Sequence, residues 1–147
     1  MSAQLPSRVP AVTDWLLANL PAAVSLDASQ VVDGPPTEAN LKSTCVIIGD
    51  TDMEQDWAAL GARNRDEQAT IKGVIYVLGA GASQTTVNKS AFALLALIEV
   101  FLRTGTNITL GSNVLWCGVC PTTIAKQQAD NARAAFLAFD LKFTARI

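Results

Sequence analysis

The sequence contains no histidine among its 147 residues. Histidine is the side chain that most often acts as a general base near neutral pH, and it is also the commonest metal ligand. Its absence removes most hydrolase triads, and no G-x-S-x-G segment is present either. An enzyme built from this chain would depend on carboxylates or lysine, yet the acids lie mainly away from the apolar segments that would raise their pKa.

Charge and long apolar runs are also scarce. Charged residues make up 16% of the chain and apolar residues 50%, which is too apolar for disorder, and the length suits one domain over residues 1–147. The longest apolar run, 91–102, contains Glu99 and is shorter than the ~20 residues that span a bilayer. Residues 1–12 lack the pattern of a secretion signal. We expect a soluble protein made in a cytoplasm, without a membrane partner and with some apolar surface covered by other subunits.

Cysteine occurs three times, and this odd number argues against a disulfide framework. Cys45 falls in a buried-strand pattern, where an inert thiol is expected. Cys117 and Cys120 belong to WCGVCP, which is similar to the active-site segment of thioredoxins. That chemistry needs the first cysteine at the start of a helix, whereas the residues after Cys120 have strand character, which would turn the two thiols to opposite faces. A thiol oxidoreductase remains an alternative, and we favour a pair without redox or metal function.

A glycine-containing segment, VIYVLGAGAS at 74–83, resembles the turn of a dinucleotide-binding βα unit. The fingerprint G-x-G-x-x-G requires a third glycine, and Gln84 occupies that position after Gly79 and Gly81. We favour an ordinary strand-to-helix turn, because glycine is the default residue where a turn needs positive φ. We therefore expect no bound cofactor.

Hydrophobic periodicity predicts an α/β (α+β) domain with one mainly antiparallel or mixed sheet of four to five strands and two main helices. The helices are expected over 7–20, ending at Pro21, and over 89–103, ending at Gly105. The strands are expected over 30–33, 43–48, 66–78, 114–119 (with 122–126 as a continuation) and 132–147. Alternation in the last strand leaves one face wet, so both helices should cover the other face, with Phe92 and Leu95 buried.

Acidic residues alternate after the second predicted strand, and their pattern is superficially like the first half of a calcium loop. These acids are Asp50, Asp52, Glu54 and Asp56. An EF-hand loop needs glycine at its sixth position and glutamate at its twelfth, where this chain has Gln55 and Gly61. We therefore expect a solvated acidic loop and no metal site.

The two halves of the chain differ in charge. Residues 1–67 contain ten acids and four bases, and residues 68–147 contain three acids and seven bases. Neither half has the clustered bases of a nucleic-acid-binding surface. An acidic face that associates with a basic face of another copy is compatible with this distribution.

Several segments resemble, in the same order, parts of one protein family. They are VVDGPP, STCVIIGD, DWAALGARNRDE, the apolar helix, LGSNVLWCGV and the terminal ARI, and together they extend from about residue 6 to residue 147. With these segments the chain resembles the tail terminator proteins of long-tailed (siphovirus-like) bacteriophages. The resemblance implies a small α/β domain that forms a hexameric ring on the tail tube, ends tube polymerisation and presents the head-tail joining surface.

The resemblance also implies partners and a location. The partners are further copies of the chain, the tail tube protein and a head-tail connector or stopper protein, while DNA passes through the lumen without sequence-specific binding. The chain would be a virion protein assembled in the host bacterial cytoplasm, neither an enzyme nor a cofactor carrier. The candidate contact or lumen residues are Asp50, Asp52, Glu54, Asp56, Arg63 and Arg65. Another neck or head-completion connector protein is the alternative within this setting.

Overall fold

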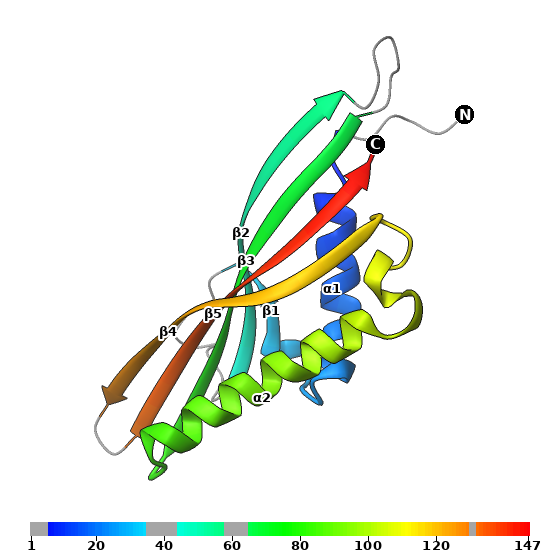
Figure 1. The fold of residues 1–147 in the computed structure, drawn as a ribbon. Coiled ribbons are helices and arrows are strands. Elements are labelled where there is room, and N and C mark those ends of the chain that lie inside the picture. Colours follow the sequence, from blue (N-terminus) through cyan, green and yellow to red (C-terminus); the bar gives the residue numbers. More distant parts are fainter. Residues whose placement is uncertain (1–5, 35–43, 58–64, 130–131) are drawn as a thin grey trace.

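A single curved sheet with two helices on one of its faces is the framework of the protein (Figure 1). The computed structural model describes residues 6–34, 44–57, 65–129 and 132–147. The helical elements of these residues are α1 (Val9–Ala23), the short 3-10 helices η1 (Ala28–Gln30) and η3 (Gly105–Thr109), and α2 (Gln84–Arg103). The strands are β1 (Val31–Asp33), β2 (Thr44–Trp57), β3 (Arg65–Ala80), β4 (Trp116–Ala129) and β5 (Ala132–Arg146).

The strand order within the described residues is β1-β2-β3-β5-β4. The short β1 pairs with β2 in parallel, and the four long strands pair antiparallel. This mixed five-stranded sheet with two α-helices confirms the predicted fold class.

The core lies between the sheet and the helices. Alternate residues of the two central strands, such as Ile71 and Ile75 in β3 and Leu137 and Leu141 in β5, are almost fully buried there. Gly73 belongs to the same row, and a Cβ atom at this position would lie 2.3 Å from the ring of Phe139 on the neighbouring strand. The alternation that predicted one buried face in β3 and β5 is therefore confirmed.

Both helices are longer than their sequence patterns predict. α1 includes Pro21, which was expected to end it. Its missing N–H removes one helical hydrogen bond, and its ring is buried on the core. α2 begins at Gln84 because Ser83 caps it, with the Thr86 backbone N–H donating to Ser83 Oγ at 3.2 Å. The predicted end is confirmed, since Thr104 caps α2 and Gly105 follows with φ of +56°.

The buried stripe of α2 does not include Phe92, so the prediction that Phe92 is buried is wrong. Ala91, Leu95, Ile98 and Leu102 face the sheet, and Phe92, one residue off this stripe, is 45% exposed. α2 is also long and apolar enough to cross a membrane by length and composition, and 28% of its most apolar 18-residue stretch is buried. This property is weak support for a membrane span, because core helices of water-soluble proteins share it.

Candidate interaction surface

The predicted acidic loop is a strand. β2 runs without interruption to Trp57, and Asp52, Glu54 and Asp56 stand opposite Thr70, Gln68 and Asp66 of β3. The prediction of a loop was wrong because acids at every second position are also the pattern of a strand with one wet face.

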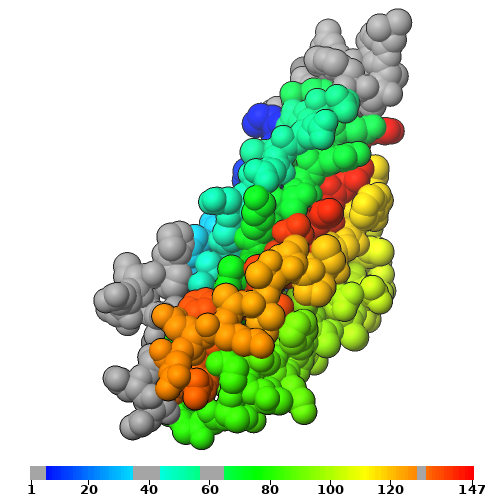
Figure 2. Space-filling view, turned by 60° about the vertical axis from the view of Figure 1, so that its left-hand side comes forward, coloured from blue at the N-terminus to red at the C-terminus, as the bar shows by residue number. Residues whose placement is uncertain are grey.

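A β-bulge decides which way these acids point. The register of β2 against β3 shifts between Ile48 and Thr51, where β2 contains one extra residue. Before the bulge, even-numbered residues such as Val46 face the helices, and after it odd-numbered residues such as Met53 do so. Asp52, Glu54 and Asp56 therefore lie on the face of the sheet that the helices leave uncovered, which we call the bare face (Figure 2).

Two ion pairs connect the acids of the bare face to bases on the central strands. Lys72 Nζ lies 3.2 Å from Asp52 Oδ2, and Arg146 Nε donates to Asp66 Oδ1 at 2.9 Å. The hydrogen bond and the charge of Asp66 raise the pKa of Arg146. Both pairs are solvent-exposed, so each contributes little to stability, and their main effect is to fix a charge pattern on the surface.

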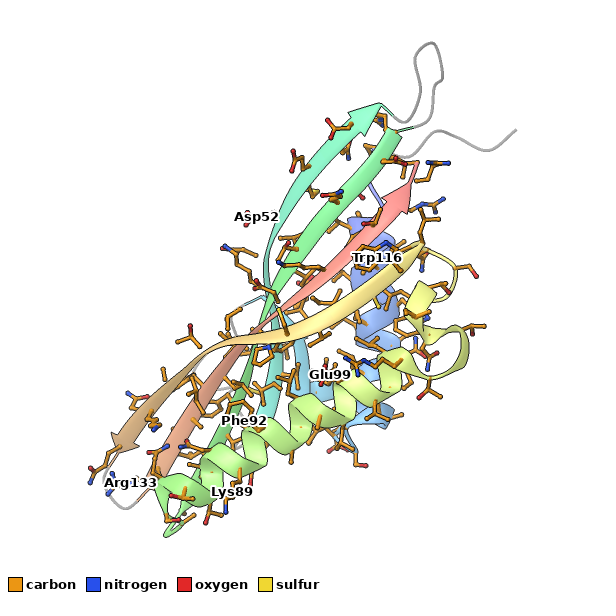
Figure 3. The ribbon with its side chains drawn as sticks, in the orientation of Figure 1. Asp52, Lys89, Phe92, Glu99, Trp116 and Arg133 are labelled. Atoms are coloured by element: carbon orange, nitrogen blue, oxygen red, sulfur yellow. The ribbon has the colours of Figure 1, made fainter. Side chains whose placement is uncertain are left out.

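A groove of about 430 Å³ crosses this part of the bare face. The residues that line it come from all four long strands: Asp52, Met53, Glu54, Gln68, Ala69, Thr70, Trp116, Lys142 and Thr144. Acids of β2 form one side, and the indole of Trp116 on β4, 51% exposed, lies on the other (Figure 3). The groove offers carboxylates, hydroxyls and an aromatic face, which suit contact with the side chains of another protein.

No group of three or more cysteine, aspartate or glutamate side chains in the described part of the chain is arranged to hold a metal ion. The alternating acids of β2 lie along an extended strand instead of converging on a point. A calcium ion needs six to eight oxygen ligands that converge.

The other half of the bare face is apolar. Cys45, Tyr76 and Ala134 are buried in a small cluster against Ile47, Leu78 and Phe136. The rings of Tyr76 and Phe136 lie with centroids 4.8 Å apart. Burial raises the pKa of the Cys45 thiol and that of the Tyr76 hydroxyl, the latter also through Cys45. Cys45 is thus the buried thiol that the sequence predicts.

Cys117 and Cys120 lie on opposite faces of β4, as predicted. Cys117 is buried in the core on the helix side, where burial raises its pKa to about 11, and Cys120 is exposed. Two residues three positions apart in a strand have Cα atoms about 10 Å apart, beyond the ~7 Å limit of a disulfide. This geometry does not suit dithiol redox chemistry.

The predicted basic candidates do not join the acids. Arg63 lies outside the described residues. Arg65 begins β3 and its Nη1 donates to Gln55 Oε1 at 2.9 Å, on the side of the sheet that carries α1. Asp50 is located at the bulge and is exposed. The structure therefore brings Asp52, Glu54 and Asp56 together and places Arg65 on the other face.

Glu67 is a polar residue that the sequence reasoning missed. It is fully buried, its Oε1 accepts the backbone N–H of Arg8 at 2.8 Å, and its Oε2 accepts Gln55 Nε2 at 2.7 Å. A carboxylate at this place satisfies the first turn of α1 and favours its dipole. The sequence contained a signal for this burial. Glu67 alternates with Ala69 and Ile71 along β3, so the pattern places its side chain on the same, core-facing side.

The glycine segment after β3 is a tight strand-to-helix turn. Gly79 lies in close contact with the helix, since a Cβ atom there would lie 2.8 Å from side-chain atoms of Ala82 and Val87. Gly81 has φ of +71°, in the region that favours glycine. Both glycines have a local structural reason that does not involve a nucleotide.

The fold and this surface define an α+β protein with one covered and one bare sheet face. No protein-family model matches the sequence, and no curated protein matches it. Among solved structures, the chain is similar to a chain of the virion of a native gene transfer agent particle, with 19% sequence identity and a TM-score of 0.39. The match covers 91% of this chain and 92% of that chain. A similarity of this size is too low to carry a conclusion about function.

Proposed function

We propose that this chain is a structural protein of a phage-like virion, and specifically a tail terminator that forms a ring on the tail tube. The observation that carries the proposal is the bare, charged face of a sheet that, within the described residues, has open strands at both edges. Such a surface suits contact with protein subunits on several sides, since open strand edges are otherwise a liability. The ring ends tube polymerisation and presents the surface to which the filled head is joined.

The distribution of charge supports a ring. The outer part of β2 carries Asp52, Glu54 and Asp56, whereas β4, on the opposite side of the four antiparallel strands, contains no acid and one base, Lys126. A ring requires heterologous contacts between two different surfaces of the same subunit. Opposite charges on such surfaces favour the correct pairing of neighbours.

Exposed apolar side chains support contacts beyond one subunit. Large apolar residues are at least one-third exposed on the strands, on α2 and beside it: Met53, Phe92, Leu97, Val100, Ile108, Leu115 and Trp116. Single exposed apolar residues are normal, but a group on α2 together with another at the start of β4 suits burial by neighbouring proteins.

The sequence resemblance to tail terminators supports the particular role. Its segments extend over nearly the whole chain. They include VVDGPP, whose first three residues form the edge strand β1, and LGSNVLWCGV, which contains the start of the opposite edge strand, β4. On this proposal the partners are six copies in a ring, the tail tube protein and the connector or stopper protein. No catalytic activity and no cofactor are part of the proposal.

The bare face is also suited to line the channel of the ring. Its strand positions hold the acids Asp52, Glu54, Asp56, Asp66 and Asp140 and the bases Lys72, Lys142 and Arg146. The excess of acid repels the phosphate backbone, so DNA would slide without being held. Another connector ring of the neck would share these features and is the second candidate.

Deleting the gene and imaging the particles by electron microscopy distinguishes the two candidates. A terminator predicts tails of uncontrolled length beside unjoined heads, because nothing caps the growing tube. A neck connector predicts tails of normal length that are not joined to heads. Normal, infectious particles after deletion would contradict both roles.

A further inference from the structure

Both outer strands of the antiparallel section have an unpaired edge. Within the described residues, β4 pairs only with β5. β2 pairs with β1 only at residues 46–48, so residues 51–57 have no described strand on their outer side (Figure 1). Each edge presents backbone N–H and C=O groups that another strand can use.

The directions of the two edges permit them to pair with each other. The section β2-β3-β5-β4 consists of four strands in which every neighbour is antiparallel, so β2 and β4 run in opposite directions. Rotation about a ring axis that runs along the strands preserves these directions. β4 of one subunit would therefore meet β2 of the next subunit antiparallel, as in the rest of the section.

The backbone hydrogen-bonding groups of the two edges are also positioned to pair. Arg65 and Ile147 exchange both backbone hydrogen bonds, at 2.8 and 2.9 Å, which fixes the alternation across the sheet. This alternation continues from strand to strand. The backbone N–H and C=O groups of Met53 and Gln55 in β2, and of Cys117 and Val119 in β4, therefore point to the open edges. Side chains of all four lie on the helix side, so pairing them would continue the sheet with every bare face on the same side.

Charge selects which edges pair. Asp52, Glu54 and Asp56 lie along the outer part of β2, so two copies of this edge repel each other. β4 contains no acid and one base, Lys126. Pro121 has no N–H to donate, and the register of β4 shifts just after it, which limits the regular edge to residues 116–120.

We propose that neighbouring subunits join by antiparallel pairing of residues 116–120 of β4 in one copy with residues 51–57 of β2 in the next copy. The partner is a second copy of this chain, and the inference rests on the proposed ring. When every subunit pairs with its neighbours in this way, the strands form one continuous sheet around the ring. No strand edge is then left open in that part of the ring. The bare face of this sheet, with Trp116 beside the acids of the neighbouring β2, forms the inner surface.

The exposed thiol of Cys120 supplies a test by disulfide cross-linking. Cys120 faces the bare side, and the pairing places it in a non-hydrogen-bonded position opposite one of the even-numbered acids of β2. Cβ atoms of such pairs are about 4.5–5.5 Å apart, close to the separation that a disulfide needs. The variants Asp52→Cys, Glu54→Cys and Asp56→Cys are assembled into rings, oxidised and separated on non-reducing gels.

At least one variant is expected to give a ladder of covalent multimers up to the closed ring. Met53→Cys is the matched control, because it is exposed on the same strand but lies on the other face, and it should give no ladder. Adding Cys120→Ser to the reactive variant should abolish the product. Cross-linking to Cys120 is confirmed by mass spectrometry of the linked peptides.

Three results would overturn the pairing. Rings seen by electron microscopy without a cross-link at any of the three positions would leave the proposed function intact but exclude this interface. Equal cross-linking of the Met53→Cys variant would mean that the subunits meet through a different contact. A product that still forms after Cys120→Ser would mean the same, for example a contact between the β2 strands of two subunits. A product that contains another virion protein would identify that protein as the occupant of the edge. Absence of rings together with normal particles after gene deletion would instead remove the proposed function itself.

Discussion

At the scale of single residues, Glu67 connects the start of α1 to the far end of the sheet. Its carboxylate accepts hydrogen bonds from Arg8 N–H and Gln55 Nε2 in a site closed to water. Replacing Glu67 with Ala leaves both donors without their acceptor, and hydrogen bonds to charged groups contribute about 1.5–3 kcal/mol each. We expect the free energy of unfolding to fall by roughly 2–4 kcal/mol, measured by urea denaturation.

Two further variants serve as controls for this prediction. Glu67→Gln keeps one acceptor oxygen and should lose less stability than Glu67→Ala. Glu54→Ala removes an exposed carboxylate on the neighbouring strand and should change stability by less than about 0.5 kcal/mol. Equal losses for Glu67→Ala and Glu54→Ala would show that the buried carboxylate is not a support of the fold.

The three thiols should differ in reactivity. The thiolate is the reactive form, and with a pKa of about 11 only about one Cys117 side chain in a thousand is ionised at pH 8, in addition to being buried. Cys45 is also buried with a raised pKa, and Cys120 is exposed. Iodoacetamide at pH 8 should therefore modify Cys120 first in the folded protein and all three cysteines after unfolding, as read by mass spectrometry. Fast modification of Cys117 in the folded protein would contradict the described burial.

At the scale of secondary-structure elements, β3 and β5 depend on close packing at one glycine. A Cβ atom at Gly73 would lie 2.3 Å from the ring of Phe139, so Gly73→Ala forces the ring or the strand to move. Overpacking of this kind costs about 1–3 kcal/mol, measurable as a lower midpoint of denaturation. Gly118→Ala is the control in β4, because no atom of the described residues lies within 4 Å of a Cβ atom placed there, and it should have little effect.

A second substitution tests the cause of that loss. Phe139→Leu removes the ring that meets the new methyl group, so the double variant should lose less stability than the sum of the two single losses. Additive losses would mean that the destabilisation of Gly73→Ala arises elsewhere in the strand.

Alternation predicted β3 and β5 well because one of their faces is apolar and the other polar over many residues. The same alternation did not identify the outer part of β2 as a strand. This part has acids on one face and Thr51, Met53 and Gln55 on the other, so neither face has the apolar pattern of a core. Only the residues at the start of α1 lie against this part of β2, so it has little to bury, and its residues resemble those of a loop. The bulge before Thr51 and the hydrogen bonds of Glu67 depend on contacts distant in sequence, which a local pattern does not contain.

At the scale of the whole molecule, the acids of β2 should matter for assembly more than for folding. Glu54→Lys reverses an exposed charge in the groove of the bare face, and it should leave the free energy of unfolding nearly unchanged while weakening ring formation. Assembly is measured by mass photometry at several salt concentrations, since screening reduces the contribution of exposed charges. Asp14→Lys makes the same change in charge on the exposed side of α1 and should assemble normally. Equal assembly of both variants would exclude a role of the acidic strand in ring contacts.

The bulge in β2 separates one strand into two parts that are free to change independently. Residues before it must fit the core beneath α1 and the apolar cluster on the bare face, so their choice is narrow. Residues after it are mostly exposed, and the extra residue decouples their alternation from that of the first part. A protein that must fit new partners without refolding could thus vary the outer part of β2 by simple substitution. Deletion of the extra residue would remove the bulge and leave residues 51–57 opposite the same residues of β3, with the same side chains on each face.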